Sequence, residues 1–391
     1  MTLNPVMTTL GRRLRLAVIG GGPGSFIGAM HRHAARLDDR YEIVAGVLSS
    51  DPRRAQKYGL EIGLVPERAY TNVTEMLDRE ASRPEGADVV AIMTPNDTHY
   101  AYAVTALERG FDVICDKPMT NTLENAKKLH RKVEDSGLVF CLTHNYTGYP
   151  MVRQAKAMVM AGQVGAIRLV QVEYVQGAGA DENTPHCSDG KLPWRYDPSR
   201  SGPSLVMGDI GSHAHNLVRF ITGLEVVEVA AEAGSILPGQ VVQDYAGALL
   251  RFDNGARGTL WVTQAAAGVE NYLRIRASGA KASLEWVQEL PQILTFKPLH
   301  GPPQKRIANG PGTLPLAARA CRMVAGHPEG FLEGFANLYS DAAEAIAARR
   351  SGTKADPLAL HFPNALDGLL GVRFIHSVIQ SSQANGRWVS C

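Results

Sequence analysis

The sequence lacks any apolar run long enough to cross a bilayer, which takes about 20 residues of helix. It has only 5 cysteines, which are widely scattered and include no CxxC pair. Such a set supports neither a disulfide framework nor a zinc knuckle, and it is typical of a reducing compartment. We therefore expect a cytoplasmic protein with no membrane partner.

Positive charge is not concentrated in any stretch of the chain. The 40 lysines and arginines are interspersed with 38 aspartates and glutamates, and the formal net charge is +2. A nucleic-acid surface normally requires a basic stripe, so no nucleic-acid partner is expected. Repeats and low-complexity tracts are also missing. A length of 391 residues, of which 45% are hydrophobic, exceeds one ordinary core and predicts two globular domains.

Short apolar runs alternate with helical patterns through the first 145 residues. The runs are rich in β-branched residues and are followed by glycine or polar residues, as in buried parallel strands. The expected strands are 14–20, 41–50, 88–95, 111–118 and 138–145. The expected helices are 25–37, 51–59, 96–110 and 120–137, with Asp51 and Asn96 as N-caps and Gly59 as a stop. This alternation predicts a Rossmann-type parallel sheet, covered on both faces, in a domain of residues 1–145.

Ligands of such sheets bind at the carboxyl ends of the strands. The loop GGGPGSFIG after the first strand offers backbone N–H groups near a helix N-terminus, which suits a pyrophosphate. Gly20 and Gly22 fit the G-x-G-x-x-G pattern, whereas the third glycine comes late, at Gly28. The strand ends and their loops supply the candidate cofactor-binding residues Gly20, Gly22, Pro23, Gly24, Ser25, Phe26, Ser49, Ser50, Arg53, Arg54, Thr94, Pro95, Asn96, His99, Asp116, Lys117 and Asn145.

The second strand is not followed by the acidic residue that usually forms hydrogen bonds to the hydroxyls of the adenosine ribose. Ser49 stands in that place, with Arg53 and Arg54 one helical turn further on. Loss of the carboxylate beside two arginines allows a 2′-phosphate, so the cofactor is expected to be NAD or NADP, with a slight preference for NADP. Alternatively, both arginines are solvated helix surface.

The alternation ends near residue 146, and residues 146–391 predict a second domain. A helix at 151–165 and a strand at 166–174 lead into a long loop, residues 177–207, which is usually a functional feature. Further strands are expected at 226–232, 246–252, 258–263, 272–277, 282–286 and 293–296, and closing helices at 327–352 and 364–382. The domain is therefore expected to be α+β, with an open and mostly antiparallel sheet.

The stretch GDIGSHAHN, residues 208–216, opens a predicted helix and permits three interpretations. Asp209 and His213 are four residues apart and share a helix face, which suits acid/base chemistry, whereas His215 points elsewhere. A metal site needs at least three converging ligands; Asp209 and His213 supply two, and the group at residues 186–189 lies in an unrelated loop, so no metal is predicted. The third possibility is that Asp209 caps the helix and His213 is an interior histidine.

The motifs TPNDTH (94–99), DKP (116–118) and DIGSH (209–213), in this order, resemble the glucose–fructose oxidoreductase/inositol dehydrogenase/MocA (Gfo/Idh/MocA) family of NAD(P)-dependent oxidoreductases. The family usually has Glu-Lys-Pro where this chain has Asp116-Lys117-Pro118. The resemblance implies a cis Lys117–Pro118 bond, and catalysis by Lys117, Asp209 and His213. It also implies an open sheet that forms a homodimer or homotetramer.

By this resemblance the protein is a dehydrogenase of a secondary hydroxyl of a sugar, inositol or glycoside. His213 is then the base, Asp209 orients the alcohol or the imidazole, and Lys117 donates a hydrogen bond to the substrate oxygen. The expected substrate is a polyol or carbohydrate. The expected substrate-binding residues are Tyr146, Trp194, Arg195, Asp197, Asp209 and His213. Two alternatives stay open: a redox-assisted glycosidase with tightly bound NAD, and a regulator that senses sugar or cofactor.

Overall fold

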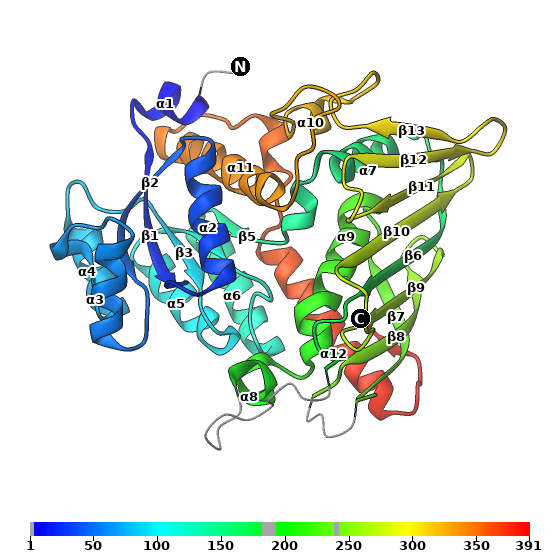
Figure 1. Cartoon of the computed structure of the whole chain (residues 1–391), viewed down its shortest axis with the longest axis horizontal. Helices are drawn as coiled ribbons and strands as arrows, with labels where there is room; N and C mark the ends of the chain where they lie inside the picture. The colour runs from blue at the N-terminus through cyan, green and yellow to red at the C-terminus, as the bar shows by residue number, and fades with distance from the viewer. Residues whose placement is uncertain (1–3, 182–192, 238–241) are drawn as a thin grey trace. The chain divides into compact units, whose positions relative to one another are not determined.

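The computed structural model describes residues 4–181, 193–237 and 242–391 (Figure 1). It divides into two compact units. The first comprises Met1–Thr120, Glu124–Gly148 and Phe331–Leu369, and the second comprises Asn121–Leu123, Tyr149–Gly330 and Leu370–Cys391. The division of the sequence into domains 1–145 and 146–391 stays a prediction. A long helix from the later part of the chain belongs to the first unit.

The first unit is built on a five-stranded parallel sheet with the strand order β2-β1-β3-β4-β5. The strands are β1 (Leu14–Gly20), β2 (Tyr41–Val47), β3 (Val89–Met93), β4 (Asp112–Cys115) and β5 (Phe140–Leu142). β3, β4 and β5 are buried along their whole length. This explains why they are continuous apolar runs in the sequence rather than alternating ones. The predicted Rossmann-type sheet is confirmed.

Helices cover both faces of this sheet (Figure 1). They are α1 (Pro5–Leu10), α2 (Phe26–Leu37), α3 (Pro52–Glu61), α4 (Val73–Ser82), α5 (Asn96–Glu108) and α6 (Leu123–Ser136), with short 3₁₀ turns η1 (Pro66–Arg68), η2 (Asn145–Gly148) and η5 (Pro357–Leu360). Asp51 caps α3 as predicted, since its side chain accepts the Arg54 N–H at 2.8 Å.

Two details of the predicted helix ends are wrong. α3 continues past Gly59 to Glu61. Gly59 is needed inside the helix because a Cβ there would lie 2.6 Å from the Cβ of Ala69. Asn96 is the first residue of α5 rather than its N-cap, and the capping position belongs to Pro95, which makes no side-chain cap bond.

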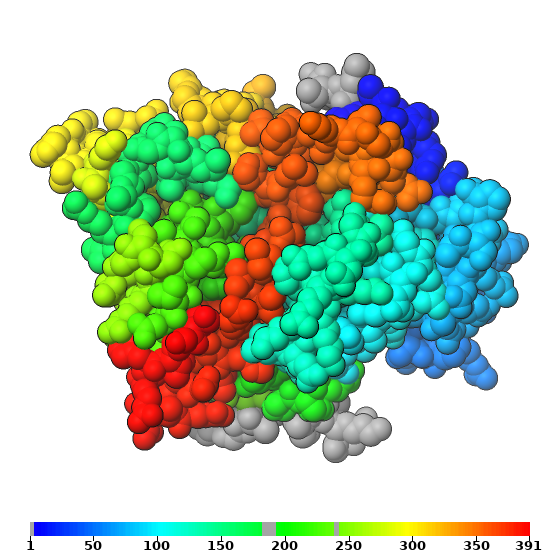
Figure 2. All heavy atoms as spheres, turned by 180° about the vertical axis from the view of Figure 1, so that it is seen from behind, coloured from blue at the N-terminus to red at the C-terminus, as the bar shows by residue number. Residues whose placement is uncertain are grey.

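The long helix α11 (Phe331–Ser351) completes the core of the first unit. It packs against α1 and α2, and Figure 2 shows its orange surface beside the blue N-terminal segment. Phe335 and Tyr339 of α11 are fully buried in the same cluster as β1 and β3 residues. Near its end, Arg349 donates two hydrogen bonds to the buried carboxylate of Asp112, at 3.0 and 2.7 Å.

The second unit is built on a nine-stranded sheet with the order β13-β12-β11-β10-β6-β9-β8-β7-β14. The strands are β6 (Ile167–Val175), β7 (Val226–Gly234), β8 (Tyr245–Phe252), β9 (Arg257–Thr263), β10 (Tyr272–Gly279), β11 (Ala282–Val287), β12 (Ile293–Pro298), β13 (Gln304–Ile307) and β14 (Val389–Ser390). Neighbouring strands are antiparallel except β6 and β9, which are parallel. The predicted mostly antiparallel sheet is confirmed.

One face of this sheet carries helices, and within the described ranges no helix packs on the other, which we call the open face. The helices of the unit are α7 (Pro150–Met160), α8 (Pro198–Ser201), α9 (Ser212–Thr222), α10 (Pro315–Ala318) and α12 (Ala365–Gln383), and the short turns are η3 (Trp194–Tyr196) and η4 (Met207–Gly211). α7 packs on β11 and β12, and α9 packs on β6 and β10 (Figure 1). Among the helices in the described ranges, none has the length and apolar character needed to span a membrane.

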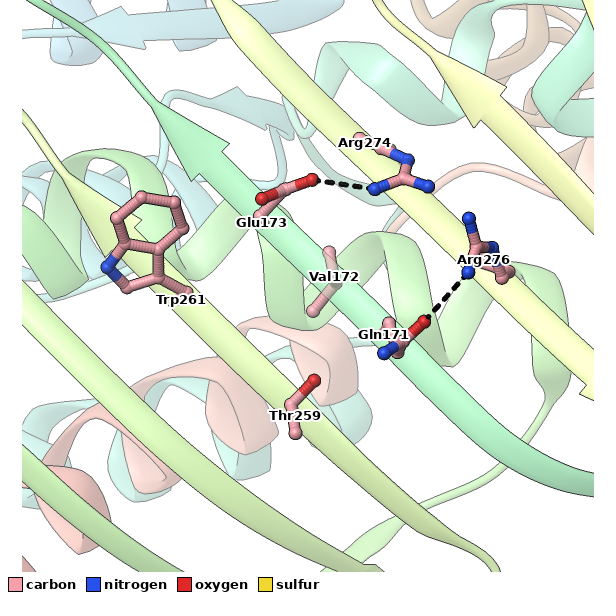
Figure 3. Close-up of a pocket in the computed structure, with 7 residues that line it drawn as sticks. All are labelled: Gln171, Val172, Glu173, Thr259, Trp261, Arg274 and Arg276. Atoms are coloured by element: carbon pink, nitrogen blue, oxygen red, sulfur yellow. Dashed lines mark hydrogen bonds and ion pairs between the residues drawn. The ribbon is translucent and has the colours of Figure 1, made fainter. Parts of the chain in front are cut away.

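The open face has a shallow hollow lined by Gln171, Val172, Glu173, Thr259, Trp261, Arg274 and Arg276 (Figure 3). Arg274 bonds Glu173 at 3.0 Å, and Arg276 bonds Gln171 at 3.3 Å. Side chains alternate between the two faces of a strand. Tyr174, the next residue of β6, is accordingly buried, and its ring lies near that of His213 on α9. The hollow and His213 are therefore on opposite faces of the sheet.

Candidate functional site

The glycine loop follows β1, as the sequence predicts. Gly21 has a left-handed backbone conformation with φ 64°, and Gly28 of α2 packs directly on it. A Cβ on Gly28 would lie 2.2 Å from the carbonyl oxygen of Gly21. The late third glycine of the motif therefore has a role, which is to let α2 approach the loop closely.

The first two turns of α2 are joined to this loop by side-chain hydrogen bonds. Ser25 caps the helix, since its hydroxyl accepts the Gly28 N–H at 3.1 Å. The next residue, Phe26, is 68% exposed, and its ring lies 5.8 Å from that of Phe331 on α11. Arg32, nearly two turns further along α2, donates to the carbonyl oxygen of Gly21. The loop is thus fixed by its own helix before any ligand arrives.

The end of β2 begins the turn into α3. The Ser49 hydroxyl accepts the Asp51 N–H at 3.1 Å, and Ser50 is exposed beside it. Arg53 and Arg54 are exposed on the first turn of α3. Both interpretations of these arginines, a 2′-phosphate contact and a solvated surface, agree with this placement.

His99 of α5 ties two strand ends together. Its Nε2 lies 2.8 Å from the carbonyl oxygen of Thr94, and its Nδ1 lies 2.9 Å from that of Pro118. The side chain is fully buried. Both ring nitrogens are therefore engaged with backbone, and the contribution of His99 to the cofactor edge is to hold the loops that follow β3 and β4.

Asp116 stabilises the turn that carries Lys117. Its Oδ1 accepts the Lys117 N–H and the Thr143 hydroxyl, each at 2.9 Å. The Lys117–Pro118 peptide bond is cis, as the resemblance implied. Buried His31 of α2 approaches the same carboxylate oxygen, with its Nε2 at 4.0 Å. One oxygen of this shorter carboxylate therefore holds the backbone of Lys117 and joins it to Thr143 after β5.

A buried donor follows β5. Asn145 is 2% exposed, and its Nδ2 has no hydrogen-bond partner among the described residues. An unmatched buried amide is costly unless a ligand or water completes it. The next residue, Tyr146, is buried with its ring 6.3 Å from that of Phe331. Together with the glycine loop, the Asn145 amide gives the first unit features that fit a dinucleotide.

In the second unit, Asp209 lies in a π-helical turn, η4, which runs directly into α9. Its Oδ2 accepts a hydrogen bond from Gln264 Nε2 at 3.0 Å and lies 3.5 Å from Arg195 Nη1. The N-cap position of α9 is Gly211, which makes no side-chain cap bond. The interpretation of Asp209 as a helix cap is therefore wrong, because its carboxylate is bound by residues far away in the sequence.

His213 and His215 of α9 have different surroundings. His213 is 8% exposed, and its ring centroid lies 6.4 Å from that of Tyr174. His215 stacks on Phe374 of α12, with the ring centroids 4.3 Å apart and an angle of 11° between the planes. The predicted separation of the two histidines onto different faces is confirmed.

Part of the predicted long loop, the segment 194–201, forms the short 3₁₀ turn η3 and the short helix α8. The guanidinium of Arg195 lies 5.2 Å from the centre of the Trp194 ring, and the same side chain reaches Asp209. Asp197 instead caps α8, where it accepts the N–H and the hydroxyl of Ser199. These hydrogen bonds lower the pKa of the Asp197 carboxyl. The structure therefore places Arg195 beside Asp209, whereas Asp197 forms hydrogen bonds within its own turn of α8.

Four polar residues that are connected to Asp209 through side-chain hydrogen bonds were not predicted from the sequence. They are Tyr174, Gln176, Gln264 and Asn271, which come from the ends of β6 and β9 and the start of β10. None belongs to a motif, and only the alternation of β6, which turns Tyr174 inward, gave a signal.

The described residues contain no metal ligand set. Among the residues described, no group of three or more histidine, cysteine, aspartate and glutamate side chains is placed to hold an ion. His186, Cys187 and Asp189, considered in the sequence as possible ligands, lie outside the described residues.

The sequence matches two family descriptions. Residues 14–146 match an oxidoreductase family with an NAD-binding Rossmann fold, and residues 152–285 match a GFO/IDH/MocA C-terminal domain. YfiI, an uncharacterized oxidoreductase of Bacillus subtilis (strain 168), is 33% identical over 387 residues, which are 97% of this chain and 97% of YfiI.

Solved structures are similar over nearly the whole chain. An oxidoreductase from Sinorhizobium meliloti is 46% identical with a TM-score of 0.87, over 97% of this chain and 99% of that one. An inositol dehydrogenase homologue from Azotobacter vinelandii, complexed with NADH and myo-inositol, is 33% identical with a TM-score of 0.90, over 98% of this chain and 99% of that one.

Proposed function

The chain belongs to the GFO/IDH/MocA family of NAD-binding oxidoreductases, and we propose that it is an NAD(P)-dependent dehydrogenase of a secondary hydroxyl of a sugar, inositol or glycoside. The observation that carries this proposal is the pair of Asp209 and His213, one helical turn apart. The Asp209 carboxylate is bound by an amide and faces a guanidinium, and His213 is almost buried. Such a pair suits proton removal from an alcohol.

Each of the three proposed catalytic residues has one role. His213 accepts the hydroxyl proton, for which a histidine near neutrality is suited. Asp209 orients the alcohol or the imidazole. Lys117 donates a hydrogen bond to the substrate oxygen, and its backbone is held in place by Asp116. When it is bound, the oxidised nicotinamide supplies the hydride acceptor.

The cofactor is proposed to lie at the carboxyl ends of the first sheet. The glycine loop and the N-terminus of α2 would hold the pyrophosphate, and Asn145 offers an unmatched buried donor. Ser49 in place of an acid allows both NAD and NADP, with a slight preference for NADP. The same strand-end set of residues, from Gly20 to Asn145, is proposed as the cofactor-binding site.

For the substrate we propose a polyol or carbohydrate. The relative from Azotobacter vinelandii is complexed with myo-inositol, which is a ring of secondary hydroxyls. Trp194 and Arg195 offer an aromatic face and a donor beside Asp209, which suits a sugar ring. Tyr146 and Asp197 are also proposed as substrate residues, although Asp197 would have to keep its cap on α8 at the same time.

The open face of the nine-stranded sheet is proposed to join subunits into a homodimer or homotetramer. It exposes Leu169, Leu249 and Trp261, next to the ion pairs of Figure 3. Exposed apolar side chains rimmed by polar residues are frequent at interaction sites. The expectation of a cytoplasmic location stays a prediction.

The test is a screen of polyols and sugars with NAD and NADP, followed by absorbance at the wavelength of the reduced nicotinamide. A dehydrogenase forms NAD(P)H in proportion to the oxidised substrate. A redox-assisted glycosidase would release sugar with no net reduced cofactor, and a sensor would bind ligands without turnover. Either of those outcomes would replace the proposal.

Variants of α9 then test the mechanism. His213→Ala should lose most of the activity and also the rise of kcat/KM with pH, whereas the matched control His215→Ala should keep both, since that ring stacks on Phe374. EDTA should change nothing, because no metal is proposed. Activity that is lost with EDTA and restored by zinc would support the metal interpretation instead.

A further inference from the structure

A chain of side-chain hydrogen bonds leads from Tyr174 to Asp209 within the second unit. The Tyr174 hydroxyl donates to Asn271 Oδ1 at 2.7 Å, and Gln176 Nε2 donates to the same oxygen at 2.7 Å. Gln264 Nε2 donates to Gln176 Oε1 at 3.1 Å and to Asp209 Oδ2 at 3.0 Å. We call these four residues, Tyr174, Gln176, Gln264 and Asn271, the amide chain.

The direction of each amide in this chain is fixed by its neighbours. Gln264 meets two acceptors, a carbonyl oxygen and a carboxylate oxygen, so its NH₂ group has to face both. If the amide were reversed, its own oxygen would lie against the carboxylate. Gln176 in turn presents its oxygen to Gln264 and its nitrogen to Asn271. The chain therefore presents an N–H donor, and never an acceptor, to Asp209.

The backbone around Gln264 is rigid. Its N–H donates to the Asp244 carbonyl at 2.9 Å, and its carbonyl accepts the Gly179 N–H at 2.9 Å. Gln176 is held in the same manner, by Thr263 and Ala266. A donor on a rigid backbone loses little freedom when it binds a carboxylate, and this is how supporting residues keep a reactive group in place.

A charged group also faces the Asp209 carboxylate: the Nη1 of Arg195 lies 3.5 Å from its Oδ2. The Arg195 side chain is 53% exposed and that of Asp209 is 25% exposed. An ion pair with an exposed arginine is screened by water and contributes little. The shorter contact from Gln264 is therefore the stronger constraint on the carboxylate.

We propose that Gln264 is the positioning residue of Asp209, and that the amide chain links Asp209 to the Tyr174 ring beside His213. This proposal rests on the proposed dehydrogenase function, and it names the residue that holds the Asp209 carboxylate in its orientation. Gln264 touches neither the substrate nor the cofactor in this scheme. It acts through the hydrogen bond to Asp209.

The variant that tests this role is Gln264→Leu, which keeps the size of the side chain and removes the donor. A hydrogen bond to a charged group contributes about 1.5–3 kcal/mol, so kcat should fall by about tenfold or more. KM should change little, because the substrate contacts remain. The acid limb of the kcat/KM profile, which belongs to Asp209 and His213 as a coupled pair, should move to higher pH, since loss of a donor favours the protonated carboxyl. The control is Gln163→Leu, an exposed glutamine of the same unit, which should behave as the wild type.

A second variant, Gln264→Glu, distinguishes positioning from packing. Its new carboxylate would repel Asp209 at neutral pH and donate a hydrogen bond once it is protonated, so its relative activity should recover as the pH falls. A variant that lost only packing would show no such recovery. Equal kcat in Gln264→Leu and wild type, or a uniform loss with an unchanged pH profile, would overturn the proposal.

One measurement does not depend on turnover. With ¹³C-labelled aspartate, the carboxyl resonance of Asp209, assigned with Asp209→Asn, is followed through a pH titration. Its midpoint should be higher in folded Gln264→Leu than in the wild type. An unchanged midpoint rejects the role of Gln264 even if the enzyme is active, and a raised midpoint supports it even if the substrate screen fails.

Discussion

We predict that His31 makes the first unit sensitive to acid. This histidine lies on α2 and is completely buried, with its Nδ1 2.7 Å from the Tyr339 hydroxyl and its ring packed edgewise on Phe335, 4.8 Å between centroids. Burial lowers the pKa of His31 to about 4, against an attraction from Asp116 that raises it. His31 is therefore neutral in the folded protein across the physiological pH range.

The direction of the effect follows from proton binding. In the unfolded chain a histidine takes up its proton near pH 6.5. Between pH 6.5 and 4 the unfolded state thus binds more protons than the folded state, and stability falls as the pH falls. A difference of about 2.5 pKa units corresponds to about 3.4 kcal/mol in full, of which about 2 kcal/mol is lost between pH 7 and pH 5. Above pH 7 His31 adds no further pH dependence.

The assay compares wild type with His31→Gln, which keeps a polar group near Tyr339 and cannot titrate. Urea unfolding, followed by far-UV circular dichroism, gives the free energy of unfolding at pH 7 and pH 5. The loss between the two values should be about 2 kcal/mol smaller in His31→Gln than in the wild type. His33→Gln is the matched control, because His33 is exposed on the same helix. The reasoning is refuted if His31→Gln loses as much stability as the wild type, or if the His31 ring titrates above pH 6 by NMR.

The remaining predictions concern the cofactor edge of the first sheet. Ser49→Asp should weaken NADP binding at least about tenfold relative to NAD in a fluorescence titration, because the new carboxylate repels the 2′-phosphate; an unchanged ratio would place the phosphate elsewhere. Lys117→Met should reduce turnover about 100-fold or more at nearly constant cofactor affinity, and near-normal turnover in folded protein would remove Lys117 from the mechanism. His99→Leu removes the one ring N–H that a single tautomer donates to the carbonyl of Thr94 or Pro118, so the free energy of unfolding should fall by about 1–3 kcal/mol; a change below about 0.5 kcal/mol in urea unfolding would contradict this.

The first sheet could be predicted because its strands are buried on both sides and are therefore unbroken apolar runs. α4 was missed, since only Met76, Leu77 and Glu80 of its ten residues are buried and the rest reads as polar loop. The packing partner of α11 could not be predicted from the sequence either. Its apolar pattern shows that it is buried, but not that it packs on α2, about 300 residues earlier in the chain.

Parts of the candidate site were accessible from the sequence because each part is local. The glycine loop, the Ser49 position and the Asp209–His213 pair each lie within a few residues of chain. The amide chain was not accessible, because its members stand alone at strand ends and are up to about 97 residues apart. Only the register of β6 with β9 and β10 brings them together.

The π-helical turn of η4 shows how local geometry refines a correct pattern. In an α-helix, four residues turn about 40° beyond a full circle, so Asp209 and His213 would lie on the same face without being directly aligned. A π-helical turn bonds i to i+5 and rotates less per residue, which moves His213 back toward the line of Asp209. Gly211 accommodates the Met207 side chain in this turn, since a Cβ there would lie 2.8 Å from the Met207 sulfur. Insertions of this kind are frequent at functional sites. Gly211 of GDIGSHAHN thus allows the π-helical turn that lies between the residues of the proposed acid/base pair.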